Sequence, residues 1–142
     1  MKYPAVFEPA PKGGFVITFP DVEPAISQGE DEQDAREMAQ DALITIFAHL
    51  IRHNKPIQPP SQPKGRKYRM IELPAIVALK TELYIAFKNS GLTKTALAQK
   101  LGIPKTTVDR LFDLRNHTRL DQIEAAFAVL GKRLAVLIED AA

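Results

Sequence analysis

LTKTALAQKLGIPKTTVDRLF, residues 92–112, has the pattern of a helix-turn-helix. Thr93 suits the N-cap of a first helix, Gly102 suits a left-handed residue that ends it, and Pro104 suits the first turn of a second helix. Ala98 falls where two crossed helices approach most closely, and a larger side chain there would push them apart. The apolar residues through which the two helices would pack are Leu97, Leu101, Ile103, Val108 and Leu111. The stretch therefore predicts two short crossed helices joined by a tight turn.

The second of these helices is expected to be a recognition helix that lies in the major groove of DNA. Its exposed cations can donate to guanine O6 and N7, and its exposed threonines can contact a thymine methyl group. A lysine at the start of the first helix, beside free backbone amides, suits a phosphate. The stretch RNHTR, residues 115–119, adds cationic and polar groups near the DNA backbone. The residues expected to contact DNA are Lys94, Lys105, Thr106, Thr107, Arg110, Arg115 and Asn116.

The charge of the 142-residue chain is divided unevenly. Residues 1–62 hold five Lys and Arg against nine Asp and Glu, a net charge of −4, whereas residues 63–142 hold fourteen against eight, a net charge of +6. An acidic half joined to a basic half suggests two tasks, with nucleic acid as the partner of the basic half. The chain has no cysteine, which excludes disulfides and zinc–thiolate sites. It shows no signal-peptide pattern and no membrane-spanning apolar run, so a cytoplasmic protein is expected.

A proline-rich segment separates the two halves. Residues 54–65, NKPIQPPSQPKG, carry four of the eleven prolines and almost nothing apolar. Because proline blocks helix and stiffens the chain, this segment is expected to be an extended connector. We expect a first domain over residues 1–73, which includes the connector, and a second over residues 74–142.

The first domain has the pattern of a small sheet with one helix. Strands are predicted over residues 2–8, 15–19, 25–28 and 66–73, with a turn at Gly13 and Gly14. An amphipathic helix precedes the last strand, and Asp31 can cap it. Its apolar stripe comprises Ala35, Met38, Ala39, Ala42, Leu43, Ile46, Phe47 and Leu50. The order β-β-β-α-β predicts an α+β domain whose helix covers one face of the sheet.

The second domain is expected to be helical. A helix over residues 75–90 carries the core stripe Ile76, Leu79, Leu83 and Phe87, and another helix over residues 120–130 ends at Gly131.

The tail, residues 133–139, has the pattern of a strand that carries Leu134, Val136 and Ile138 on one face. It has no partner strand in its own domain. It is either a loose apolar tail or a strand that pairs with its copy in a second subunit. The second reading is favoured because an unpaired apolar edge is a liability. A homodimer follows, and such dimers can pair again into tetramers.

Catalytic chemistry is not expected. A two-metal nuclease needs several carboxylates that converge from strands and a helix, but the first strand offers only Glu8, at its end. His49 and His53 have the spacing of a helical metal pair, but no carboxylate lies between them, so a surface pair is favoured. No Ser-His-Asp pattern and no phosphate-binding glycine loop is evident. No enzyme activity, metal or cofactor is therefore predicted.

The chain resembles the HicB family of antitoxins, in the subgroup that has a helix-turn-helix tail. The resemblance rests on MKYPAVFEPAPKGGF (1–15), FPDVEPAISQGE (19–30), QDALITIF (40–47), MIELPAIVALK (70–80) and the helix-turn-helix itself. It implies an N-terminal domain like a truncated ribonuclease H fold that lacks that enzyme's activity. This domain would bind and block HicA, a small ribonuclease toxin with a fold like a double-stranded-RNA-binding domain. The tail would bind the operator of the toxin–antitoxin operon.

One departure from the helix-turn-helix of phage repressors lies after the second helix. Those proteins often have Glu-Asn-Gly or Glu-Arg-Gly there, whereas this chain has Phe112-Asp113-Leu114. The loop that would contact the DNA backbone is therefore less well defined by the sequence than the recognition helix.

The acidic half is the expected toxin-binding part, because a ribonuclease surface must attract phosphate and is therefore basic. One candidate contact is the acidic cluster at residues 30–34, which suits helix capping equally well, and another is the loop after the second strand. The candidate residues are Phe19, Asp21, Glu30, Asp31 and Asp34. The alternative function is a stand-alone transcriptional regulator whose N-terminal domain senses a small ligand.

Overall fold

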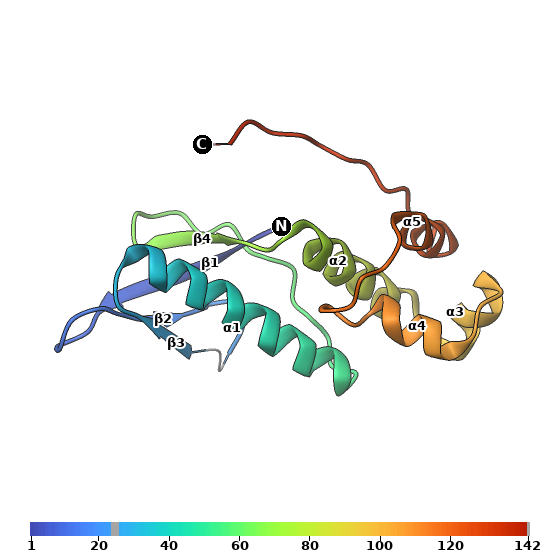
Figure 1. Ribbon diagram of the computed structural model, residues 1–142, viewed down its shortest axis with the longest axis horizontal. Helices are drawn as coiled ribbons and strands as arrows, with labels where there is room; N and C mark the ends of the chain where they lie inside the picture. Colours follow the sequence, from blue (N-terminus) through green and yellow to red (C-terminus); the bar gives the residue numbers. More distant parts are fainter. Residues whose placement is uncertain (24–25, 142) are drawn as a thin grey trace.

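The N-terminal half is an antiparallel sheet with one long helix across one of its faces (Figure 1). A computed structural model of the protein describes residues 1–23 and 26–141. The strands are β1 (Lys2–Pro9), β2 (Phe15–Thr18), β3 (Ile26–Gly29) and β4 (Tyr68–Glu72), in the spatial order β3-β2-β1-β4. The predicted α+β class and the order β-β-β-α-β are confirmed. Ala25, where the third strand was expected to begin, lies outside the described residues.

Helix α1 (Glu32–Arg52) covers the sheet with a stripe of small and apolar residues. Its fully buried positions are Ala35, Ala39, Leu43 and Phe47, and Ile51 continues the stripe. The expectation that Met38 belongs to this core is wrong, because its side chain is 41% exposed. Gly29 ends β3 so close to the helix that a Cβ atom there would lie 2.4 Å from the Ala35 Cα. Glycine is therefore required where β3 turns into α1.

The proline-rich connector is held at several points. Residues 54–65, all described, form neither helix nor strand, as predicted for an extended segment. The Tyr3 hydroxyl donates to the Gln58 carbonyl at 2.9 Å, and the Tyr84 hydroxyl donates to the Lys55 carbonyl at 2.6 Å. The Ser61 amide and hydroxyl both donate to the Asp21 carboxylate, at 2.8 and 2.7 Å. The connector is thus part of the packed structure.

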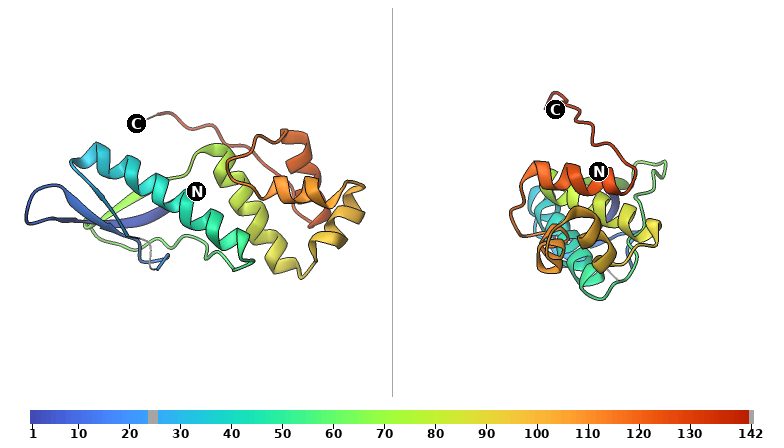
Figure 2. Two further views of the ribbon diagram at one scale, coloured as in Figure 1. Left: turned by 60° about the horizontal axis from the view of Figure 1, so that its bottom comes forward. Right: turned by 90° about the vertical axis from the view of Figure 1, so that its right-hand side faces the viewer.

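The C-terminal half consists of helices α2 (Ala75–Ser90), α3 (Lys94–Leu101), α4 (Lys105–Leu111) and α5 (Leu120–Val129). Helix α2 runs between the sheet and the other helices (Figure 2). The predicted burial of its core stripe is confirmed for Leu83 and Phe87, but Ile76 and Leu79 are only half-buried. Because α2 is covered from two sides, it buries a wider face than a surface helix. The additional buried residues are Val77, Lys80, Thr81 and Tyr84.

The tail does not form the predicted strand within one copy of the chain. Residues 132–141 leave α5 and extend into solvent on the side of the N-terminal half (Figures 1 and 2). Leu134 packs partly against the core, whereas Val136 and Ile138 are 72% and 86% exposed. A strand exists only where a neighbour completes its hydrogen bonds, and the described part of the chain offers the tail no such neighbour. Pairing with a second copy stays a prediction.

Candidate functional site

Helices α3 and α4 have the geometry that the sequence predicted for residues 92–112. The Thr93 hydroxyl accepts the Ala96 amide at 3.0 Å and caps α3. Gly102 is left-handed, with φ 67°, so that the Ile103 amide turns back to the Ala98 carbonyl at 3.1 Å. Of the residues predicted to pack the two helices together, Leu97, Ala98, Val108 and Leu111 are buried, whereas Leu101 and Ile103 are half-buried. The turn is therefore closed by local hydrogen bonds and fixes the angle of α4 on α3.

The face of α4 that points away from this core carries three of the seven predicted DNA contacts. Lys105, Thr106 and Arg110 are exposed, whereas Thr107 is half-buried. Beyond the helix, Arg115 is exposed and Asn116 is half-buried. The structure thus places two cations and one threonine hydroxyl on the exposed surface of α4.

Lys94, the predicted phosphate contact, is paired within the protein. Its Nζ atom donates to Asp109 Oδ1 at 3.0 Å, which joins the start of α3 to the middle of α4. The pair is partly exposed on both sides, so it contributes little to stability and can be exchanged for another ion pair.

Lys80, which no pattern in the sequence marked as functional, is fully buried. Its ammonium group donates to the carbonyls of Arg110 at 2.9 Å, Asp113 at 2.8 Å and Asn116 at 2.7 Å. These carbonyls belong to the last turn of α4 and to the loop that follows it, so Lys80 closes the end of α4 where phage repressors often use a glycine turn. Burial lowers the pKa of Lys80, and the Asp113 carboxylate opposes that shift.

Arg115, another predicted DNA contact, reaches the N-terminal half instead. Its Nη2 atom lies 3.3 Å from Thr45 Oγ1 and 3.7 Å from Asp41 Oδ1, both on α1. The contact is exposed and so can be broken at low cost. In the free protein it ties the loop after α4 to the helix that covers the sheet.

Several of the predicted toxin contacts have partners inside the protein. The Asp31 carboxylate accepts the Asp34 amide at 2.8 Å, and the Asp34 carboxylate accepts the Glu30 amide at 2.8 Å. Both residues therefore cap the start of α1. Helix capping was the role that the sequence indicated as strongly as toxin contact. Asp21 holds Ser61 of the connector. Phe19 is only 2% exposed. The expectation that the loop after β2 presents this side chain to a toxin is therefore wrong, because the side chain belongs to the core.

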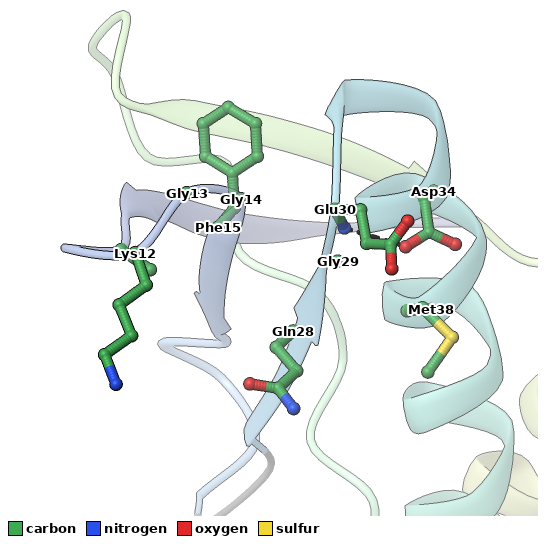
Figure 3. Close-up of a pocket in the computed structure, with 10 residues that line it drawn as sticks. Lys12, Gly13, Gly14, Phe15, Gln28, Gly29, Glu30, Asp34 and Met38 are labelled. Atoms are coloured by element: carbon green, nitrogen blue, oxygen red, sulfur yellow. Dashed lines mark hydrogen bonds between the residues drawn. The ribbon is translucent and has the colours of Figure 1, made fainter.

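A cavity of about 530 Å³ opens beside this acidic cluster (Figure 3). It lies between the Gly13–Gly14 turn, the end of β3 and the start of α1. The side chains of Glu30 and Asp34 lie side by side at its wall, with Met38 one turn further along the helix (Figure 3). The lining thus combines two carboxylates and the exposed Met38 on the α1 side with Lys12 on the side of the Gly13–Gly14 turn. The acidic side suits a cationic side chain with an aliphatic stem.

Among the described residues, no three His, Asp or Glu side chains gather where they could hold a metal ion. The rings of His49 and His53 do lie together, with centroids 4.3 Å apart, but without a third ligand. No helix in the described part of the chain is long and apolar enough to cross a membrane.

Together these features define a small α+β protein that carries a helix-turn-helix with an exposed second helix. Residues 2–82 match the family described as HicB-like antitoxin of bacterial toxin–antitoxin systems. Similar proteins include Antitoxin HicB 1 of Photorhabdus laumondii subsp. laumondii, 39% identical over 98% of this chain and 88% of that protein, and Antitoxin HicB of Escherichia coli strain K12, 39% identical over 97% and 99%. The chain belongs to the HicB-like antitoxin family.

A solved structure also shows some likeness. A chain of a toxin–antitoxin complex from Streptococcus pneumoniae is 29% identical, with a TM-score of 0.40 over 44% of this chain and 45% of that chain.

Proposed function

We propose that this antitoxin binds and neutralises a small HicA-like ribonuclease toxin through its N-terminal half, and represses its own operon by binding operator DNA through α4. The observation that carries the DNA-binding part is the exposed face of α4, where Lys105, Thr106 and Arg110 project from a helix whose other face is buried. The charge of +6 in residues 63–142 supports it. Both partners would be met in the cytoplasm.

The proposed DNA complex has two-fold symmetry. A dimer would place two copies of α4 about one turn of DNA, ~34 Å, apart, so the operator is an inverted repeat. Lys105 and Arg110 would read guanines, and Lys94 and the loop at Arg115 and Asn116 would contact the backbone. To do so, Lys94 must leave Asp109 and Arg115 must leave α1, and both pairs are exposed enough to exchange.

The proposed toxin site is the acidic wall of the cavity beside β3 and α1. Although Asp34 is engaged in capping, each carboxylate has further acceptor capacity, and Glu30 gives only its backbone amide to that contact. A lysine or arginine of a basic toxin would fit between Glu30 and Asp34. Neutralisation by covering an active site needs about 800 Å² per partner and a few anchoring residues, but no catalytic group.

The DNA-binding part is tested by Arg110→Ala. Because Arg110 would make a bidentate contact to one guanine, we expect a loss of about 1–3 kcal/mol at the operator and a relaxed preference at one base pair in each half-site. The measurement is a quantitative gel shift with the DNA upstream of the chain's own operon. The control is Lys100→Ala, which removes an exposed cation from α3. If Lys105, Thr106 and Arg110 can all be replaced without loss of operator affinity, α4 is not the helix that reads the DNA sequence.

The toxin-binding part is tested by co-expression with the product of a short neighbouring gene that encodes a basic protein. The wild-type chain should rescue growth, and Glu30→Lys should weaken the complex and reduce the salt dependence of its association. Glu124→Lys, which makes the same charge change on the exposed face of α5, is the matched control. Equal effects of the two variants would place the toxin elsewhere.

The second candidate function is a stand-alone regulator that senses a small ligand, and the cavity of about 530 Å³ is the observation that favours it. It predicts no toxin gene nearby, and operator binding that changes when a small cation is added. If a neighbouring gene encodes a toxin that the chain neutralises, the antitoxin function is supported and the stand-alone regulator is excluded.

A further inference from the structure

We propose that Asp109 determines how strongly the protein prefers its operator over other DNA, because it holds the Lys94 ammonium until a phosphate is presented in the correct position. The inference rests on the proposed DNA-binding function. Its basis is the 3.0 Å ion pair between Lys94 Nζ and Asp109 Oδ1, which crosses from the first helix of the motif to the second.

The position of Asp109 is unusual for a surface that must approach a polyanion. It lies on the exposed face of α4, with its side chain 52% exposed, one turn after Lys105 and directly before Arg110. Within the described part of the chain, its carboxylate makes an ion pair with Lys94 and none with its two neighbours on α4. The carboxylate therefore faces back towards α3, where Lys94 would otherwise be free to bind any phosphate.

The consequences differ between operator and other DNA. On the operator, base contacts fix the register, so Lys94 meets its phosphate. The Asp109 carboxylate then lies near the base edges, whose amino groups can donate hydrogen bonds to it. On other DNA the protein rests against the backbone without base contacts. There Asp109 keeps Lys94 occupied and adds a like charge next to the phosphates. Asp109 thus weakens binding to other DNA more than binding to the operator.

The experiment measures affinity and salt dependence for two duplexes, the DNA upstream of the chain's own operon and a scrambled duplex of the same composition. The variants are Asp109→Asn, Lys94→Gln and the double variant. Glu32→Gln removes a carboxylate of another exposed ion-pair site, with Arg36 and Arg69 in the N-terminal half, and is the matched control. Circular dichroism verifies that each variant is folded.

We expect Asp109→Asn to tighten binding to scrambled DNA about 3- to 10-fold at low salt, and to steepen its log–log salt slope by about one, as for one more phosphate contact. Operator affinity should change less, so the ratio of the two affinities falls. In the Lys94→Gln background the same substitution should have little effect on the slope, because the cation that Asp109 restrains is gone. Glu32→Gln should leave the ratio unchanged.

Three results would overturn the inference. An equal gain on both duplexes would make Asp109 a general repulsive charge. A loss confined to the operator would make it a base reader, and a full effect in the Lys94→Gln background would show that it acts without Lys94. The preference of the wild-type protein for its upstream DNA is measured first and separately. If the wild type shows no such preference, the proposed DNA-binding function is refuted instead.

Discussion

Lys80 is the residue whose removal we expect to affect the C-terminal half most. Lys80→Met keeps the length of the side chain but leaves three carbonyls at the end of α4 without their donor. Loss of charge-assisted hydrogen bonds at a buried site should lower the free energy of unfolding by about 3 kcal/mol. Urea denaturation measures this. The control is Lys88→Met, two turns later on α2, whose exposed contacts to Asn54 should contribute less than about 1 kcal/mol.

Operator binding gives a second measurement on the same residue. Because Lys80 positions the loop with Arg115 and Asn116, the Lys80→Met protein should bind operator DNA weakly even where it is folded. A variant as stable and as tightly bound as the wild type would mean that the loop holds its position without Lys80.

Two buried tyrosines should make stability depend on alkaline pH. Burial raises the pKa of the Tyr3 phenol, with the charges of Glu82 and Asp21 adding to the shift, and burial also raises the pKa of Tyr84. A group with a raised pKa keeps its proton longer in the folded protein than in the unfolded chain. The stability it contributes is therefore complete below the unfolded pKa of about 10 and is lost as the pH rises further.

The urea midpoint should accordingly fall above about pH 10, the unfolded tyrosine pKa. Tyr3→Phe removes the ionisation together with one hydrogen bond, to Gln58. That variant should be less stable at neutral pH but should lose stability less steeply above pH 10. A slope as steep as that of the wild type would show that Tyr3 does not govern the alkaline transition.

The difference between Lys80 and the helix-turn-helix residues shows what a sequence can reveal about single positions. Thr93, Ala98 and Gly102 act on residues a few positions away, so their spacing was sufficient to predict them. Lys80 depends on carbonyls thirty and more residues later, and no local pattern records them. The only available sign was a lysine in line with the apolar residues Val77 and Tyr84 on one helix face.

Among the elements of the structure, the C-terminal tail is the one that we expect to hold the dimer together. Deletion of residues 133–142 should convert dimers into monomers and reduce operator affinity strongly, because two recognition helices would no longer be held on one DNA molecule. Light scattering measures the first effect, and a gel shift the second. A milder test is Val136→Lys with Ile138→Lys, which charges the exposed apolar residues without shortening the chain. A truncated protein that remains dimeric would move the interface elsewhere.

The tail also shows where prediction of elements ends. Alternation of apolar and polar residues was enough for β1, β2 and β4, because each has a neighbour in the same chain. For the same alternation in residues 133–139, the described residues provide no such neighbour, and the segment forms no strand. A pattern of side chains gives the preference for a strand, but the hydrogen-bond partner decides whether one forms.

For the whole molecule, we expect toxin neutralisation to be separable from DNA binding. Residues 1–73 contain the sheet, α1 and the acidic wall of the cavity, so this fragment should rescue growth in co-expression with the toxin. The matched fragment is residues 1–90, which adds α2 and restores the bond from Tyr84 to Lys55. The match to the family also extends past residue 73, to residue 82.

The pair of fragments locates the boundary. Rescue by both places the toxin site in residues 1–73, and rescue by residues 1–90 alone places the boundary after α2. If both fold and neither rescues growth while the full chain does, the division of labour is wrong.

The separation of the chain into an acidic and a basic half was visible in its charges and its prolines. The way the halves are joined was not. Tyr3 binds the connector from the segment before it and Tyr84 from the segment after it, and Arg115 reaches α1 from the loop after α4. Such contacts depend on the finished packing of both halves, so neither composition nor periodicity could indicate them.

The anchored connector has a consequence for how the molecule tumbles. A free proline-rich linker would let the two halves rotate on separate timescales. Here the halves should diffuse as one elongated body, with a single rotational correlation time. For a fluorophore attached near the Gly13–Gly14 turn, far from α4, the fluorescence anisotropy should therefore decay more slowly once α4 binds a DNA duplex.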